Sequence, residues 1–482
     1  MRFNFSEVSS NVNEVERSFK LHCCSKLRDF VFKYEDLLGK EIWDVLDEEI
    51  QQDPGAFLSA INSYASRKGN LPIYLLIDEY DNFTNTILST YGTEYYQKAT
   101  HGEGFVRGFF NVIKAATTGT GSALQRMFIT GVSPVTMDDV TSGFNIGTNI
   151  TTDPWFNDLV GFSEAELREM LTYYKEQGVL MQTVDETIVM MKPNYDNYCF
   201  SEEKLAQCMF NSDMALYFMK SFVLHHVKPK EIVDPNIRTD FNKLAYLIRL
   251  DHGLGENFSV IKEIAEQGEI TTDIATHFSA LEMTDVRNFK SLLFYFGLLS
   301  IKGVDMVGRP ILHVPNLVVR EQLFSFLIQG YIKHDIFKID MNRMTMLFEN
   351  MAFRGDWKPL FNFIAEAIRE QSRIREYIEG EAHIKGFLLA YLGMYRYYQL
   401  YPEYELNKGF ADFLFKPSPS VPVMPPLTYL LEVKYAKAGA SEKEIRALAD
   451  EAREQLLRYS QDELVAEAKA KGGLKLITIV WC

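Results

Sequence analysis

The segment TYLLEVKYA (428–436) places an acidic and a basic residue in the middle of a strand-like apolar run. Side chains alternate between the two faces of a β-strand, so Leu430, Glu432 and Lys434 share one face. A buried charge that lacks a partner or a metal ion is costly, so this placement requires an explanation. Asp412, in the preceding segment KGFADFLF, is expected on the adjacent strand of a hairpin, where it could share a cation with Glu432.

Two carboxylates, a lysine and Mg²⁺ or Mn²⁺ make a hydrolytic site for phosphodiesters. Carboxylate oxygens suit a hard cation, which stabilises charge on the scissile phosphate, and Lys434 can position or help activate the water. The alternative is an edge strand whose solvated Glu432 and Lys434 protect against aggregation. The spacing alone leaves both interpretations open.

The last hundred residues are expected to run α-β-β-α-β. Helices continue to about Tyr401, two strands follow, and a long polar helix from Ser441 to about Lys471 precedes the terminal strand LKLITIVW. One face of that helix carries a stripe that includes Gln455 and Tyr459. These two side chains either line a substrate groove or are satisfied residues at its rim.

A second constellation lies in LPIYLLIDEYDNF (71–83), where an apolar run leads directly into two acidic residues. A fully apolar strand is typical of a parallel sheet buried on both faces, and such sheets bind ligands beyond the carboxyl ends of their strands. The pattern has the form of a Walker B motif, in which Asp78 would hold Mg²⁺ through water and Glu79 would polarise the attacking water. Alternatively, Asp78 caps the following helix. Thr130, at the end of a second short apolar run, would be a sensor-like residue on a neighbouring strand.

The sequence contains no G-x-x-x-x-G-K-[ST] segment. Without it there is no cradle of backbone N–H groups and no lysine for the phosphates of a nucleotide. This predicts that the chain does not turn over ATP by itself.

Composition limits the class of protein. The chain has 482 residues, 47% of them hydrophobic, with no apolar run that approaches a membrane span and no secretory N-terminal pattern. Its five cysteines form no C-x-x-C pair, which favours a reducing, cytoplasmic location. The net charge of -15 argues against a protein that coats DNA but allows a local nucleic-acid site.

These segments together resemble the bacterial AAA-ATPase-like proteins that carry a C-terminal PD-(D/E)XK nuclease domain. YLLIDEYDNF is similar to the Walker B line of that family, and EAHIKGFLLAYL, ELNKGFADFLF, YLLEVKYA and EAREQLLRY resemble its nuclease core in order. The resemblance implies that Asp412 is the first acidic residue of the nuclease motif and that Glu432 and Lys434 form its E-x-K. It further implies roles for Glu381 on the first core helix and for Gln455 and Tyr459 on the later helix.

The expected fold class is α/β, with three parts. A truncated P-loop-type ATPase-like domain that lacks Walker A spans 1–160, a helical and winged-helix-like linker spans 161–370, and a restriction-endonuclease-like domain spans 371–482. Family members begin with a P-loop segment before a strand such as RFNFSEVS, so the resemblance predicts such a segment upstream of Met1. ATP would be a cofactor only with that segment restored, and its loss would expose apolar neighbours in the sheet.

The predicted function is that of a Mg²⁺- or Mn²⁺-dependent nuclease with a degenerate ATPase-like regulatory module. Its partner would be nucleic acid, with DNA favoured over RNA, and the chain could form a homo-oligomer but would not enter a membrane. The alternatives are an ATP-binding switch, or a non-catalytic interaction protein with a structural nuclease fold.

Overall fold

The computed structural model describes residues 1–69, 71–118, 121–140, 147–225, 256–333, 339–370, 381–395, 397–406, 409–418, 421, 423–437 and 439–481. Contacts divide the chain into two compact units. The N-terminal unit contains Met1–Asp153 and Asp273–Gly297, and the C-terminal unit contains 154–225, 256–272 and the described residues from 298 onward. The three-part division predicted from the sequence stays a prediction.

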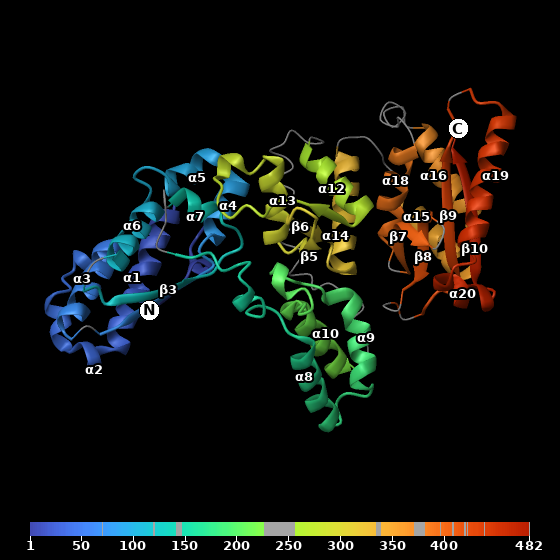
Figure 1. Ribbon diagram of the computed structural model, residues 1–482. Helices are drawn as coiled ribbons and strands as arrows, with labels where there is room; N and C mark the ends of the chain where they lie inside the picture. The colour runs from blue at the N-terminus through green and yellow to red at the C-terminus, as the bar shows by residue number, and fades with distance from the viewer. Residues whose placement is uncertain are drawn as a thin grey trace. The chain divides into compact units, whose positions relative to one another are not determined.

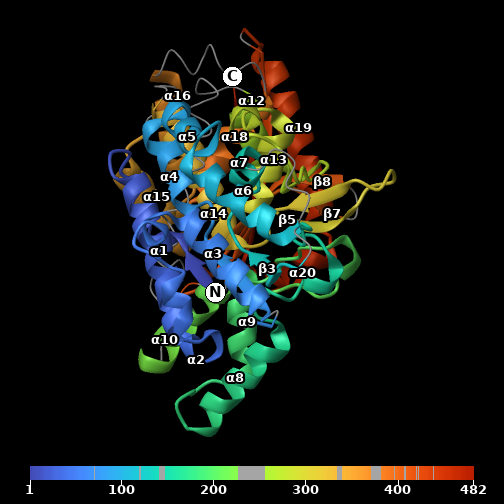
Figure 2. The same ribbon diagram turned by 90° about the vertical axis from the view of Figure 1, so that its left-hand side faces the viewer.

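The N-terminal unit is built on a parallel sheet in the order β1-β2-β3. Its strands are β1 (Arg2–Asn4), β2 (Ile73–Asp78) and β3 (Leu124–Ile129). Figures 1 and 2 show three of its helices beside one another: α1 (Val15–Lys33), α3 (Pro54–Arg67) and α6 (Phe105–Thr118). The Phe3 ring on β1 packs edge-on against Phe109 on α6, with centroids 5.6 Å apart, so these helices cover one face of the sheet. The shorter helices are α2 (Glu35–Leu38), α4 (Asn82–Tyr91), α5 (Thr93–Thr100), α7 (Val135–Val140) and α13 (Val286–Tyr295).

The prediction that the Walker B-like strand is buried on both faces is wrong for the described structure. Ile73, Leu75 and Ile77 are buried, but Tyr74 is 58% exposed and Leu76 44% exposed. The reason is that the described helices cover only one face, so the strand alternates as a half-buried strand does. The three parallel strands belong to an α/β unit, and the P-loop fold remains a prediction.

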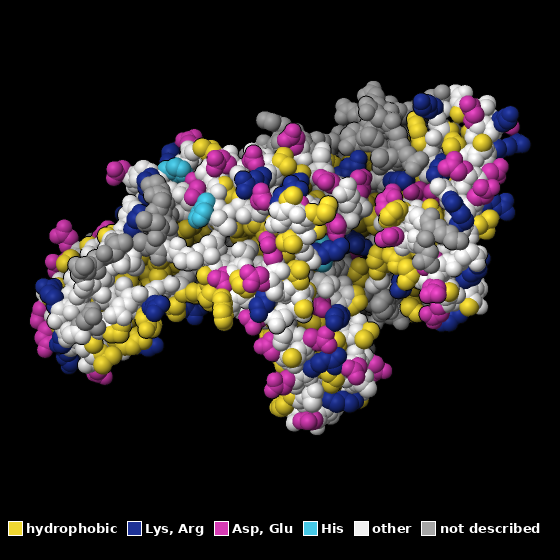
Figure 3. All heavy atoms as spheres, viewed as in Figure 1, with side chains coloured by type: hydrophobic (Ala, Val, Ile, Leu, Met, Phe, Trp, Pro, Cys, Tyr) yellow, Lys and Arg dark blue, Asp and Glu magenta, His cyan; other side chains and the backbone are white. Residues whose placement is uncertain are grey.

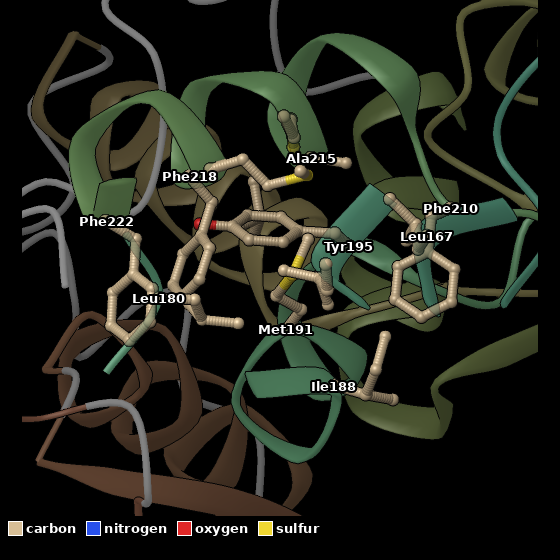
Figure 4. Packing of buried hydrophobic residues seen from close by; sticks show 13 residues of the cluster. Leu167, Leu180, Ile188, Met191, Tyr195, Phe210, Ala215, Phe218 and Phe222 are labelled. Carbon is tan, nitrogen blue, oxygen red and sulfur yellow. The ribbon is translucent and has the colours of Figure 1, made fainter. Parts of the chain in front are cut away.

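The first helices of the C-terminal unit share a hydrophobic core. They are α8 (Glu164–Glu176), α9 (Val184–Tyr195) and α10 (Ser212–His225). Ser163 caps α8 in a reciprocal capping box with Glu166. Figure 4 shows the core, in which the rings of Tyr195 and Phe218 lie 5.8 Å apart in an edge-on contact.

A small antiparallel sheet follows, in the order β4-β6-β5. Its strands are β4 (Glu269–Thr271), β5 (Ser300–Val304) and β6 (Pro310–His313), and helices α12 (Glu256–Gln267) and α14 (Leu317–Lys333) lie before and after it in the chain. In the chain, helix α13 precedes the β5–β6 pair and helix α14 follows it. Membership of the winged-helix class stays a prediction.

The C-terminal sheet is mixed, in the order β10-β9-β8-β7. Strand β9 pairs parallel with β10 and antiparallel with β8, so it lies inside the sheet. The strands are β7 (Tyr398–Leu406), β8 (Gly409–Pro417), β9 (Thr428–Tyr435) and β10 (Leu474–Trp481). The helices of this region are α15 (Met341–Arg354), α16 (Lys358–Glu370), α18 (Glu381–Gly393), α19 (Glu442–Tyr459) and α20 (Glu463–Ala470).

Two predictions about this region are wrong. Residues 398–406 form strand β7, where the sequence was expected to be helical to about Tyr401. An aromatic-rich segment favours a strand, and Pro402 disfavours a helix but is tolerated in the edge strand that β7 is. The long polar helix is also interrupted, because Asp462 caps a new helix, α20, through its bond from the Leu464 N–H. The order is therefore α-β-β-β-α-α-β.

No helix among the described residues is long and apolar enough to cross a bilayer.

Candidate active site

Glu432 lies in the interior of the C-terminal sheet. On β9 it is opposite Thr478 of β10, and it is only 3% exposed. Lys434, two residues further along, has a side chain that is 14% exposed. The alternative of a solvated pair on an edge strand is therefore wrong, because β9 has a neighbour on each side and both charges are largely withdrawn from water.

Asp412 lies beside Glu432, as the hairpin prediction required. The β8–β9 register pairs Phe413 with Leu431, which brings Asp412 opposite Glu432. The Asp412 N–H is 3.5 Å from Glu432 Oε2, and Asp412 Oδ2 accepts a 2.6 Å hydrogen bond from the Val433 N–H. Asp412 is 4% exposed. Adjacent strands thus hold two buried carboxylates together.

Each buried carboxylate is paired with a lysine. Lys434 Nζ is 3.3 Å from Glu432 Oε1 and 3.6 Å from Oε1 of Glu451 on α19. Lys385, on α18, forms an ion pair with Asp412 Oδ1, and its Nζ is also 3.1 Å from Glu403 Oε1 on β7. Each acid therefore has an ammonium group close by, from a different element in the two cases.

The buried acids have raised proton affinities. Burial foremost, and then the charge of Asp412, raises the pKa of Glu432 to about 7, against the opposing effect of Lys434. Burial also raises the pKa of Asp412, although Lys385 and the Val433 N–H favour its charged form. Both carboxylates therefore lack full compensation for their charge, which is the condition under which a further cation is bound well.

Gln455 and Tyr459 lie on α19, which packs against β9 and β10. Gln455 is one helical turn beyond Glu451, and its buried Oε1 has no hydrogen-bond partner in the described part of the chain. Tyr459 is buried, and its pKa is raised by burial and then by the charge of Glu432. A Cβ built on Gly409 would lie 2.9 Å from the Tyr459 hydroxyl oxygen, so the phenol lies close over the start of β8.

Glu381 is the first residue of α18, the helix that also carries Lys385. Its side chain lies outside the described part of the structure. Its predicted role therefore stays a prediction.

The donor set fits a hard divalent cation by its chemistry. Asp412 and Glu432 supply adjacent anionic oxygens, which Mg²⁺ and Mn²⁺ prefer over nitrogen or sulfur. The described side chains form no cluster of three or more His, Cys, Asp or Glu residues with metal-site geometry. An ion at this position would therefore need ligands beyond these two carboxylates, such as water or phosphate oxygens.

The second predicted constellation is also assembled, at the carboxyl end of β2. Thr130 Oγ1 donates a 2.7 Å hydrogen bond to Asp78 Oδ1, and an Arg2 guanidinium nitrogen is 3.1 Å from Oδ2. These contacts, with Thr130 foremost, lower the pKa of Asp78. The predicted sensor-like residue and the Walker B-like aspartate are thus brought together from neighbouring strands.

The alternative that Asp78 caps the next helix is wrong. Helix α4 follows Asp81, whose buried carboxylate accepts bonds from the Val132 and Ser133 N–H groups at 3.0 and 2.9 Å. Glu79 has a left-handed φ of 51° and accepts a 2.6 Å hydrogen bond from Asn82 Nδ2. Asp81 therefore holds the loop after β3 in place through hydrogen bonds. Asp78 and Glu79 lie at the carboxyl end of β2, the central strand of the sheet.

Sequence reasoning missed Lys385, Glu403 and Glu451. Lys385 follows Glu381 by four residues, so helical spacing places both on one face of α18, which was an available signal. Glu451 likewise precedes Gln455 by four residues on α19. Glu403 was missed because strand β7, on which it lies, was not predicted.

Two family models match separate parts of the chain. Residues 1–141 match the AAA-ATPase-like family, described as a predicted AAA-ATPase, and residues 379–482 match the PD-(D/E)XK nuclease superfamily. Neither the curated proteins nor the solved structures contain a protein that matches this chain.

Proposed function

We propose that this chain, which joins a predicted AAA-ATPase region to a PD-(D/E)XK nuclease domain, is a divalent-metal-dependent nuclease that hydrolyses phosphodiester bonds. The observation that carries the proposal is the pair of buried carboxylates, Asp412 and Glu432, on adjacent strands with Lys434 beside them. Burial of both acids at this position costs stability, which a role in binding a cation explains.

Each residue has a distinct proposed task. Asp412 and Glu432 would hold Mg²⁺ or Mn²⁺, and a bound ion supplies charge stabilisation at the scissile phosphate. The Lys434 ammonium would hold and orient the attacking water, while Glu451 keeps that ammonium near the strand. Gln455 would turn its partly buried side chain toward the bound substrate, and Glu381 would contribute from the start of α18.

The substrate is proposed to be nucleic acid, with DNA favoured over RNA. On the face shown in Figure 3, described Lys and Arg side chains are interspersed with Asp and Glu rather than gathered into a continuous basic band. With a net charge of -15, attraction of a polyanion would therefore depend on the local site and on the metal ion.

The N-terminal unit is proposed to serve as a regulatory or recognition module for the nuclease domain and not to hydrolyse ATP. The Asp78–Thr130 contact at the carboxyl end of β2 supports a second candidate function, an ATP-binding switch, for which Asp78 and Glu79 would face Mg-ATP. The missing glycine-rich lysine segment argues against tight binding by the chain as given. Self-association of the chain remains part of this proposal.

The test uses the purified full chain with supercoiled DNA, single-stranded DNA and RNA. D412N and E432Q should each reduce cleavage on the order of a thousandfold, because each removes a metal contact worth several kcal/mol in the transition state. K434M should slow cleavage while sparing most metal affinity. E467Q, at an exposed Glu–Lys pair on α20, is the matched control.

Cleavage should need Mg²⁺ or Mn²⁺, whereas Ca²⁺ should support binding without turnover because its looser coordination positions water poorly. Equal cleavage by wild type and all variants would identify a contaminant and reject the assignment. No cleavage of any substrate with any metal would favour the alternative of a non-catalytic interaction protein with a structural nuclease fold.

A further inference from the structure

We propose that Lys385 is an internal cation that competes with the divalent metal ion for Asp412, and that Glu403 retains its ammonium when the ion binds. The inference rests on the proposed function in one respect, that Asp412 is a metal ligand. It assigns to α18 a control over how readily the site takes up metal.

The first support is the position of Lys385. Its ammonium contacts Asp412 Oδ1 directly, and its side chain is only 20% exposed. A metal ion on that oxygen and an ammonium in the same place would repel each other strongly in so buried a setting. Lys385 must therefore move away from Asp412 for an ion to bind there.

The second support is that the Lys385 ammonium already contacts a second carboxylate, that of Glu403. Lys385 Nζ is 3.1 Å from Glu403 Oε1, and the Glu403 side chain is 54% exposed. The β7–β8 register pairs Pro402 with Phe413 and Tyr404 with Ala411, which brings Glu403 opposite Asp412. A small rotation of the lysine side chain could therefore exchange one carboxylate for the other.

The backbone conformation of Glu403 is unusual for a residue in a strand. Glu403 has a left-handed φ of 42° within a strand, a conformation that a non-glycine residue seldom adopts. Its pair with Lys385 shows that its carboxylate reaches the side of the sheet on which Asp412 meets α18. The local distortion of β7 thus accompanies the placement of a second acceptor for Lys385.

The third support is a surplus of carboxylates around the lysine. Glu266 of α12 approaches α18 where Gly386 leaves room, since a Cβ there would lie 2.7 Å from Glu266 Oε1. That buried oxygen has no hydrogen-bond partner in the described part of the chain, although Lys262 Nζ is 3.8 Å away. An ammonium released from Asp412 therefore stays among negative charges.

The experiment measures Mn²⁺ affinity of the full chain, by calorimetry and by electron paramagnetic resonance of the free ion, at fixed pH and ionic strength. K385M should bind Mn²⁺ on the order of tenfold more tightly than wild type, because the competitor is gone. E403Q should bind it more weakly, because Lys385 is then left with Asp412. K471M, at the exposed Lys471–Glu467 pair, should match wild type.

Thermal unfolding provides a readout in the same proteins. Metal-free K385M should unfold at a lower temperature than wild type, because Asp412 loses its counter-ion, and Mn²⁺ should raise that temperature more in K385M than in wild type. K385Q, which keeps a polar side chain, should show the same order of affinities if K385M folds poorly.

Unchanged or weaker Mn²⁺ binding in both Lys385 variants would overturn the proposal, as would the absence of Mn²⁺ binding in wild type and variants at millimolar ion. A nuclease assay run in parallel separates the two hypotheses. The predicted order of affinities without any cleavage would support the competition and reject the nuclease. Cleavage that depends on Asp412, with an unchanged affinity in K385M, would reject the competition alone.

Discussion

At the scale of single residues, Gly409 controls how closely α19 approaches the candidate site. It has a positive φ of 141°, and an added Cβ would lie 2.9 Å from the Tyr459 hydroxyl. Gly409→Ala should therefore reduce the free energy of unfolding by about 1–3 kcal/mol, through both backbone strain and overpacking. Chemical denaturation measures this change.

Gly439→Ala is the matched control for that substitution. Gly439 also has a positive φ, 87°, but an added Cβ there meets nothing within 4 Å. Gly439→Ala should therefore reduce the free energy of unfolding only through backbone strain. Adding Tyr459→Phe to Gly409→Ala should restore some of the lost stability, because it removes the clashing oxygen. If the two changes in unfolding free energy simply add in the double variant, the clash does not contribute.

The sequence predicted some residues of the candidate site and missed others. Period-two alternation and hairpin spacing were sufficient to bring Asp412, Glu432 and Lys434 together, because both depend on local geometry alone. Lys385 and Glu403 could not be placed in the same way. Their meeting depends on how a helix packs on the sheet and on a left-handed residue inside a strand, and neither is encoded in a periodic pattern.

At the scale of secondary structure, strand β6 carries a half-buried histidine whose titration should affect stability. His313 lies between Glu269 of β4 and Ser300 of β5 in the register. Its pKa is lowered to about 4 by burial first and then by Lys302, with a smaller contribution from Arg320 and an opposing one from Glu269. The folded state thus keeps the ring neutral where the unfolded chain, with a pKa near 6.5, binds a proton.

Because the unfolded state binds more protons between pH 6.5 and 4, this residue should remove stability as the pH falls through that window, by at most about 3 kcal/mol. The measurement is the free energy of unfolding of wild type minus that of His313→Gln across the window. His277→Gln, at a side chain that is 73% exposed, is the control. A difference between wild type and His313→Gln that does not change with pH would contradict the prediction.

The same scale explains the errors in the sequence assignment. A capping residue was a good guide at α19, since the Ser441 capping box begins that helix where expected. The break before α20 depends on Asp462, a cap inside a polar sequence that otherwise favours a continuous helix. The exposed face of β2 was missed because an apolar run does not reveal which of its faces other elements cover.

At the scale of the whole molecule, the division into two compact units predicts that metal should stabilise only one of them. Asp412 and Glu432 belong to the C-terminal unit, and β2 with its buried Leu75 belongs to the N-terminal unit. Differential scanning calorimetry should therefore resolve two unfolding transitions. Mn²⁺ should raise the temperature of one, by an amount that grows with the logarithm of its concentration above the dissociation constant.

Two substitutions assign these transitions. Leu75→Ala should lower one of them, because it removes a buried leucine side chain at a cost of about 2–5 kcal/mol, and should leave the Mn²⁺-dependent transition in place. Glu432→Gln should leave the Leu75-dependent transition unchanged and abolish the shift with Mn²⁺. A single transition that both Leu75→Ala and Mn²⁺ displace would mean that the units unfold as one, in which case metal uptake at Asp412 would be coupled to the state of the ATPase-like sheet.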